Sequence, residues 1–257
     1  MTNIRVGVLV QPQHTTWPAY AAAVQRVEAL GVDTIWTWDH FFPCWGDPEG
    51  SSFEGWSLLT AMAVLTRRAE VGCMVTCNSY RNPNLLADMA RTVDHISAGR
   101  LILGIGAGWF ERDYQAYGYA FEPPAGRLKA LEENLATIRG RWPLLVPPPT
   151  RPIPVLVGGG GEKVTLRLVA RYADIWNGFG PAEEYGRKNQ ILDAWCRQIG
   201  RDPDEIERSI TVDVQDVPAG LDESRAAGAT HLVMRMGDPW DFTQVERLVA
   251  WREQQNQ

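Results

Sequence analysis

Short apolar runs alternate with segments of helical period along the whole chain of 257 residues. The runs are apolar at nearly every position, which is typical of strands buried on both faces of a parallel sheet. Eight strands are predicted, each followed by a helix, and eight such units in about 250 residues favour a (β/α)₈ TIM barrel of the α/β class. We expect residues 1–257 to form one barrel domain. The alternative is an open, doubly wound sheet.

The expected elements follow from the apolar pattern and from residues that begin or end helices. Strands are predicted at 4–10, 33–38, 69–76, 100–105, 155–157, 174–176, 209–214 and 231–236. Helices are predicted at 17–30, 56–65, 83–96, 127–139, 162–172, 182–199, 221–227 and 242–254. A proline-rich segment, 147–154, is interpreted as a surface crossover between the two halves of the barrel.

Charge, hydropathy and cysteine usage exclude several classes of function. Lys and Arg number 25 against 31 Asp and Glu, which argues against nucleic acid or an anionic membrane as the main partner. No run approaches the roughly 20 apolar residues of a membrane helix, and the N-terminus does not resemble a secretory signal. The 4 cysteines lack zinc-ligand and Cys-x-x-Cys spacing, so we expect free thiols, no metal site and a cytoplasmic location.

Polar residues gather at the expected carboxyl ends of the strands, which is the face where barrels carry their active sites. His40 follows the second strand and is the candidate general acid or base. Its neighbour Asp39 cannot readily face the same way, so we expect it to hydrogen-bond a ligand hydroxyl. A histidine that caps a loop is an equally good interpretation of His40. The 11 Trp fit either a packed core or a pocket for a planar ligand.

Two glycine-rich segments also follow strands. The first consists of Gly158, Gly159, Gly160 and Gly161, which precede a helix and leave backbone N–H groups bare. A phosphate at this helix N-terminus is the favoured interpretation, and a flexible turn is the alternative. In the second, Gly104, Gly106 and Gly108 alternate with other residues after the fourth strand. That spacing differs from a dinucleotide fingerprint but suits a flat ring or a long cofactor tail.

Six segments of the sequence resemble the bacterial luciferase-like superfamily, in particular its deazaflavin-dependent oxidoreductases. They are WDHFF at 38–42, FEGW at 53–56, VTCNSYRNP at 75–83, SAGRLILGIGAGW at 97–109, PVLVGGGGEK at 154–163 and ARYADIWN at 170–177. The resemblance covers about residues 4–180 with specific motifs, and the last third more loosely. It implies a TIM barrel that binds coenzyme F420, or FMN, at the strand ends, and it suggests a homodimer.

The resemblance also implies roles for individual residues. Asp39 and His40 would meet the ring or the ribityl chain of the cofactor. Cys73 and Met74 would form the family's non-proline cis peptide behind the ring. Thr76, Gly106 and Gly108 would line the ring and ribityl region, and the glycines at 158–161 would take the phosphate.

The sequence departs from the family pattern at two places. The segment between the fourth helix and Pro152 is short where relatives carry an insertion over the substrate. Trp109 stands where the sugar-phosphate-oxidising branch has a catalytic Glu, which disfavours a sugar phosphate as substrate.

The favoured function is hydride transfer between a deazaflavin coenzyme and a small organic substrate. An FMN-dependent monooxygenase and a flavin-binding or deazaflavin-binding protein without turnover are the alternatives. A barrel lyase or isomerase ranks last, since it would need a Lys or paired carboxylates at the strand ends.

Overall fold

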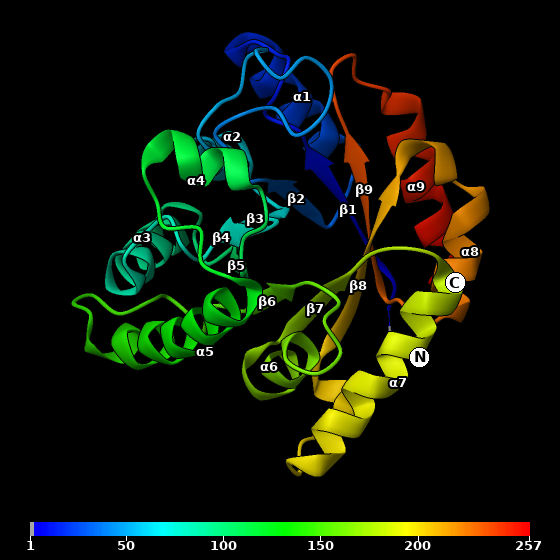
Figure 1. Ribbon diagram of the computed structural model, residues 1–257. Helices are drawn as coiled ribbons and strands as arrows, with labels where there is room; N and C mark the ends of the chain where they lie inside the picture. Colours follow the sequence, from blue (N-terminus) through cyan, green and yellow to red (C-terminus); the bar gives the residue numbers. More distant parts are fainter. Residues whose placement is uncertain (1–2) are drawn as a thin grey trace.

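The computed structural model describes residues 3–257 and forms a closed barrel of parallel strands surrounded by helices (Figure 1). The strands are β1 Arg5–Val10, β2 Thr34–Thr37, β3 Glu70–Cys73, β4 Thr76–Cys77, β5 Leu101–Gly106, β6 Val155–Gly158, β7 Ile175–Gly178, β8 Glu207–Asp213 and β9 His231–Met236. Their order is β3-β2-β1-β9-β8-β7-β6-β5-β4, and pairing of β3 with β5 closes the ring. The predicted TIM barrel is therefore confirmed.

The helices pack on the outside of the barrel. They are α1 Trp17–Ala29, α2 Gly55–Leu65, α3 Pro83–Ile96, α4 Glu111–Tyr117, α5 Pro124–Arg141, α6 Thr165–Tyr172, α7 Ala182–Gln198, α8 Ala219–Ala226 and α9 Phe242–Gln255. Side chains of Thr16, Glu54 and Asn82 accept hydrogen bonds from first-turn N–H groups of α1, α2 and α3, which fixes where these helices begin. Between residues 3 and 257, no helix is both long and apolar enough to cross a membrane.

Three differences from the expected elements lie at the carboxyl ends of strands. The third predicted strand is broken into β3 and β4 by a cis peptide between Met74 and Val75. The expectation that Cys73 and Met74 form this bond was wrong by one residue. The helix expected from residue 162 begins only at Thr165, because residues 162–164 form a turn.

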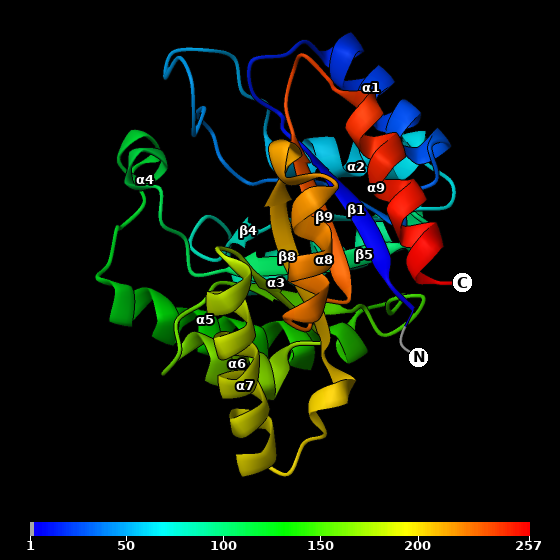
Figure 2. The same ribbon diagram turned by 90° about the vertical axis from the view of Figure 1, so that its right-hand side faces the viewer.

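Helix α4 was not expected. No helix is predicted at residues 111–117, because a segment of seven residues that begins with three charged side chains carries little helical periodicity. Figure 2 shows α4 outside the ring of helices.

The core has two apolar layers. One lies between the strands and the covering helices. The other fills the inside of the barrel with Leu9, Trp36, Trp38, Met74, Ile102, Leu156, Ile175 and Val233. At the amino ends of the strands, Arg5 pairs with Glu70 and Glu207. The barrel is thus filled through its middle and closed at one end by ion pairs, which leaves the carboxyl ends of the strands to form a pocket.

Candidate functional site

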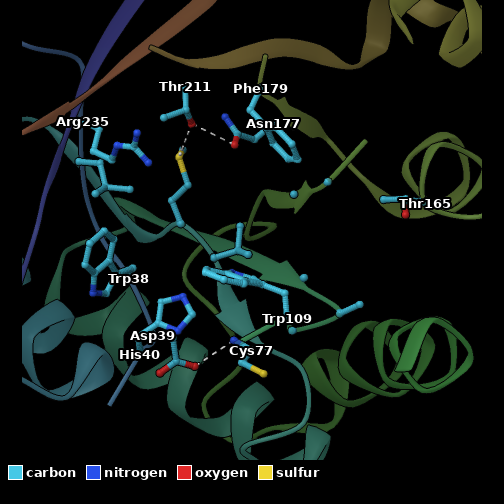
Figure 3. A pocket seen from close by; sticks show the side chains of 18 of the residues that line it. Trp38, Asp39, His40, Cys77, Trp109, Thr165, Asn177, Phe179, Thr211 and Arg235 are labelled. Atoms are coloured by element: carbon cyan, nitrogen blue, oxygen red, sulfur yellow. Dashed lines mark hydrogen bonds between the residues drawn. The ribbon is translucent and has the colours of Figure 1, made fainter. Parts of the chain in front are cut away.

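A pocket of about 420 Å³ lies at the carboxyl ends of the strands. It is lined by Leu9, Trp38, Asp39, His40, Trp45, Met74, Val75, Cys77, Tyr80, Gly106, Ala107, Gly108, Trp109, Gly158, Gly159, Thr165, Asn177, Phe179, Thr211 and Arg235. Figure 3 shows Thr211, Asn177 and Phe179 at one end of the pocket and Asp39, His40 and Cys77 at the other. Strand ends that are far apart in sequence thus meet at one place.

The sequence-predicted site residues fall into three groups. Those at the pocket surface are Asp39, His40, Met74, Gly106, Gly108, Gly158 and Gly159. Cys73 and Thr76 are buried in the barrel wall, where the Thr76 hydroxyl accepts a hydrogen bond from the Trp56 indole N–H. Gly160 and Gly161 line a neighbouring hollow with Lys163 and Lys188.

His40 is held by a buried carboxylate from α4. Its Nδ1 lies 2.8 Å from Oδ2 of Asp113, and that carboxyl group is completely buried. Asp113 also accepts hydrogen bonds from the backbone N–H groups of Phe41 and Phe42 and from the Tyr80 hydroxyl. A carboxylate that accepts from Nδ1 fixes the imidazole orientation and leaves Nε2 free to exchange a proton with a ligand. The geometry therefore permits acid–base chemistry at His40.

Aromatic rings surround His40 on its other sides. Trp38, Trp109 and Phe110 lie edge-on to the imidazole, with ring centres 6.0, 5.5 and 5.4 Å from it. These contacts and the Asp113 bond together leave only 15% of the His40 side chain exposed. A proton at His40 is therefore shielded from bulk water except through the pocket.

Asp39 has a different environment from the expected one. Its carboxylate is fully buried and accepts two hydrogen bonds from the Arg81 guanidinium, at 2.6 and 2.9 Å, and one from the Cys77 N–H. Arg81 also donates to Glu54, at 2.6 Å. Burial lowers the pKa of Arg81, but attraction to Asp39 and Glu54 outweighs it and raises that pKa above its usual value. Asp39 is thus already bonded within the protein, and its role toward a ligand hydroxyl stays a prediction.

The cis peptide places Val75 against two of the predicted glycines. A Cβ at Gly106 would lie 2.7 Å from Cγ2 of Val75, and one at Gly158 would lie 2.8 Å from Cγ1. Both distances are shorter than atoms tolerate. These glycines are therefore required by the close packing of Val75, a reason that the sequence did not reveal.

The glycines at 159–161 form a backbone cradle. Gly159 has a φ of +128°, and its N–H donates to the carbonyl of Asn177. Across residues 3–257, the N–H groups of Gly160 and Gly161 have no acceptor. A Cβ at Gly160 would lie 2.7 Å from Nζ of Lys188, which bonds Glu184 at the same time. Free amides beside a lysine fit the phosphate of a flavin or deazaflavin, and Thr165 adds a hydroxyl at the start of α6.

Asp113 is the residue of the candidate site that sequence reasoning missed. It lies 73 positions from His40, and no local pattern links the two. The same holds for Asp213 and Arg235, which meet across β8 and β9. Within residues 3–257, no three His, Cys, Asp or Glu side chains are grouped as a metal site requires.

Comparisons with known proteins agree with this architecture. An uncharacterised protein of Mycobacterium tuberculosis (strain H37Rv) is 28% identical over 85% of this chain and 87% of its own length. An F420-dependent glucose-6-phosphate dehydrogenase of Amycolatopsis mediterranei is 28% identical over 58% of this chain and 48% of its own length. A solved F420-dependent secondary alcohol dehydrogenase superposes with a TM-score of 0.85 at 16% identity, covering 98% of both chains.

The family itself follows from the sequence match. Residues 1–215 fit the model of the luciferase-like monooxygenases. This match spans most of the 257 residues, and the barrel, the pocket at the strand ends and the glycine cradle fall largely within it. The chain therefore belongs to the luciferase-like monooxygenase family.

Proposed function

We propose that this protein is a coenzyme F420-dependent oxidoreductase that transfers a hydride between the deazaflavin and a small organic substrate. The observation that carries the proposal is His40, which lies at the pocket with Nδ1 bonded to buried Asp113 and Nε2 available. The glycine cradle at 159–161 supports it, because the free N–H groups of Gly160 and Gly161 can donate to the cofactor phosphate. The similarity to proteins named as F420-dependent enzymes supports it as well.

In this proposal the cofactor supplies the hydride, and the residues of the pocket move the proton and exclude water. A reduced deazaflavin supplies a hydride when it is bound. His40 then donates a proton from Nε2 to the substrate oxygen, so that a carbonyl becomes an alcohol, and in the reverse direction it takes that proton back. Asp113 stabilises the charged imidazole in either direction. The surrounding indole and phenyl rings exclude water from the reacting atoms.

Cofactor binding tests the first half of this proposal. The purified protein is titrated with F420 and, separately, with FMN, and Trp fluorescence is recorded; Trp38, Trp45 and Trp109 line the pocket and report on its occupation. We expect F420 to bind at least tenfold more tightly than FMN. The opposite order would indicate an FMN-dependent monooxygenase. Binding of neither would overturn the assignment of the cradle.

Substitution of His40 tests the second half. In His40→Asn we expect F420 affinity within about twofold of the unchanged protein and a fall in hydride transfer of roughly 10²–10⁴-fold, the range for a positioned acid–base group. His95→Asn is the matched control, because His95 lies far along α3 and bonds the carbonyl of Pro148. Equal rates in both variants would remove His40 from the reaction. Tight F420 binding without transfer to any substrate would favour a binding protein.

A further inference from the structure

We propose that the substrate is an uncharged, flat, largely apolar carbonyl compound or the corresponding alcohol, and that Asp213 keeps anionic molecules out by pairing with Arg235. This inference deepens the proposed function and rests on it. It concerns the part of the pocket around Trp38, His40, Trp45, Trp109 and Arg235.

Every charged side chain at the pocket already has a partner of opposite charge. Among the described residues that line the pocket, the groups able to carry charge near neutral pH are Asp39, His40 and Arg235. Asp39 is bonded to Arg81 and His40 to Asp113. The third, Arg235, donates from Nε to Oδ1 of Asp213 at 2.9 Å, and its Nη2 also contacts that oxygen.

The other ionisable groups of the pocket are neutral. Burial raises the pKa of the Cys77 thiol and of the Tyr80 phenol above their usual values. A substrate with a phosphate or carboxylate group would therefore meet an arginine whose charge Asp213 already balances, which makes its binding less favourable than that of a neutral molecule.

Arg235 is fixed by the barrel itself rather than by a flexible contact. Asp213 and Arg235 are direct neighbours in the β8–β9 ladder, so the register of the two strands holds the pair together. The guanidinium also lies 4.5 Å from the centre of the Trp45 ring, where it is held over the indole face. A ligand that draws the guanidinium away from this position would have to break both contacts.

The same region offers flat apolar surface. Trp38 and Trp45 are 5.3 Å apart between ring centres, and Trp109 lies beside His40. Trp45 and Trp109 are 47% and 58% exposed, which is unusual for so large an apolar ring and leaves surface for a ligand to cover. Planar substrates bury such surface with little loss of their own conformational entropy.

Substrate and product of this reaction are both uncharged. The carbonyl carbon gains the hydride and its electron pair from the reduced coenzyme, and the carbonyl oxygen gains a proton from His40, which recovers one from solvent. The substrate is reduced by two electrons and the coenzyme is oxidised by two. Ketone and alcohol are both neutral, so both fit a pocket in which the ion pairs are already complete.

The test uses two molecules of the same shape and different charge, 4-formylbenzamide and 4-formylbenzoate. Their binding to the F420-loaded protein and to the protein without cofactor is measured by calorimetry for the unchanged chain, Asp213→Asn and Arg235→Gln. We expect the unchanged protein to prefer the amide at least tenfold. Asp213→Asn frees Arg235 and is expected to reduce the preference to twofold or reverse it. Arg235→Gln leaves the carboxylate of Asp213 without its guanidinium partner, and this variant is expected to keep the preference for the amide.

The outcomes separate this inference from the proposed function. Equal binding of both probes by the unchanged protein, or of neither up to millimolar concentration, would overturn the inference, as would an unchanged preference in Asp213→Asn. A protein that prefers the amide but does not bind F420 would refute the proposed function and leave standing only the preference of the pocket for uncharged ligands. Thermal unfolding of Asp213→Asn, together with its F420 affinity, shows that the variant is folded.

Discussion

At the scale of single residues, the side chains at the pocket surface are oriented by other side chains behind them. His40 contributes its imidazole, but Asp113 decides which of its nitrogens meets a ligand. Asp113 in turn is oriented by two backbone N–H groups and by Tyr80. Replacing the Asp113 carboxylate by an amide removes these hydrogen bonds, because the amide NH2 group presents a donor where His40 and Tyr80 need an acceptor.

We therefore expect Asp113→Asn to slow hydride transfer by about 10²-fold, the lower end of what a positioned acid–base group contributes. The affinity for F420 should change less than threefold, because the Asp113 carboxylate lies behind the pocket wall. Asp88→Asn makes the same chemical change on α3, where Asp88 pairs with Arg141, and should leave the rate within twofold. A rate in Asp113→Asn equal to that of the control would show that His40 needs no such partner.

Gly160 provides a prediction on cofactor affinity. A methyl group there meets the flexible end of Lys188, which can move, so we expect the free energy of unfolding to change by no more than about 0.5 kcal/mol. The methyl would nevertheless occupy the approach to the free amides, and we expect Gly160→Ala to weaken F420 binding by about tenfold, or roughly 1.4 kcal/mol. Gly140→Ala on α5 has open space around it and serves as the control. Unchanged affinity in Gly160→Ala would place the phosphate elsewhere.

At the scale of elements, α4 packs against the loop at 39–54, whose residues Asp39, His40 and Trp45 line the pocket, and the two segments together are called the cover. Arg112 of α4 donates to the carbonyl of Pro48 at 2.6 Å and to Glu49 at 2.5 Å, and it lies 4.2 Å above the Phe42 ring. Phe41 of the loop stacks on Tyr117 at the end of α4. The cover is thus held by contacts between two segments that are separated in sequence by α2, β3, β4, α3 and β5.

Removing the Arg112 contacts should loosen this loop without unfolding the barrel. For Arg112→Met we expect faster amide hydrogen exchange at residues 42–53 and a loss of stability below about 1 kcal/mol, since the ion pair with Glu49 is partly exposed. Arg127→Met is the matched control, because Arg127 also lies over an aromatic ring, Phe121, but does not reach the loop. The same exchange rates in both variants would mean that other contacts hold the cover.

The elements also show how far the sequence alone could lead. Strands and long helices could be predicted because continuous apolar runs and the 3.6-residue period are local properties. Helix α4 could not, because its stability comes from rings contributed by Phe41 and Tyr80 rather than from its own pattern. Candidate residues at strand ends could be named from the topology. The partners of His40 and Asp39, which are Asp113 and Arg81, could not, and neither could the pair of Asp213 and Arg235, since each pairing joins distant parts of the chain.

At the scale of the whole molecule, the two ends of the barrel differ in the groups that occupy them. The carboxyl ends form the pocket, and the amino ends are sealed by charged groups around a buried histidine. His231 is fully buried, its Nε2 lies 2.8 Å from the Thr34 hydroxyl, and its Nδ1 lies 3.3 Å from Glu207. Burial lowers the pKa of His231 well below its usual value, and the positive charge of Arg5 lowers it further. The folded protein thus keeps this imidazole neutral.

Because the folded protein keeps His231 neutral and the unfolded chain can protonate it, the free energy of unfolding depends on pH in a definite direction. Below about pH 6.5 the unfolded chain binds a proton at residue 231 that the folded chain does not, so the free energy of unfolding falls with decreasing pH. Above that pH neither state binds it, and the contribution is constant. One such group gives a slope of up to about 1.4 kcal/mol per pH unit. We expect this slope in urea unfolding between pH 6.5 and 5 for the unchanged protein relative to His231→Gln, in which Glu207 titrates as before. Parallel curves for the two proteins would show that His231 is protonated in the folded barrel, with Glu207 as its counter-ion.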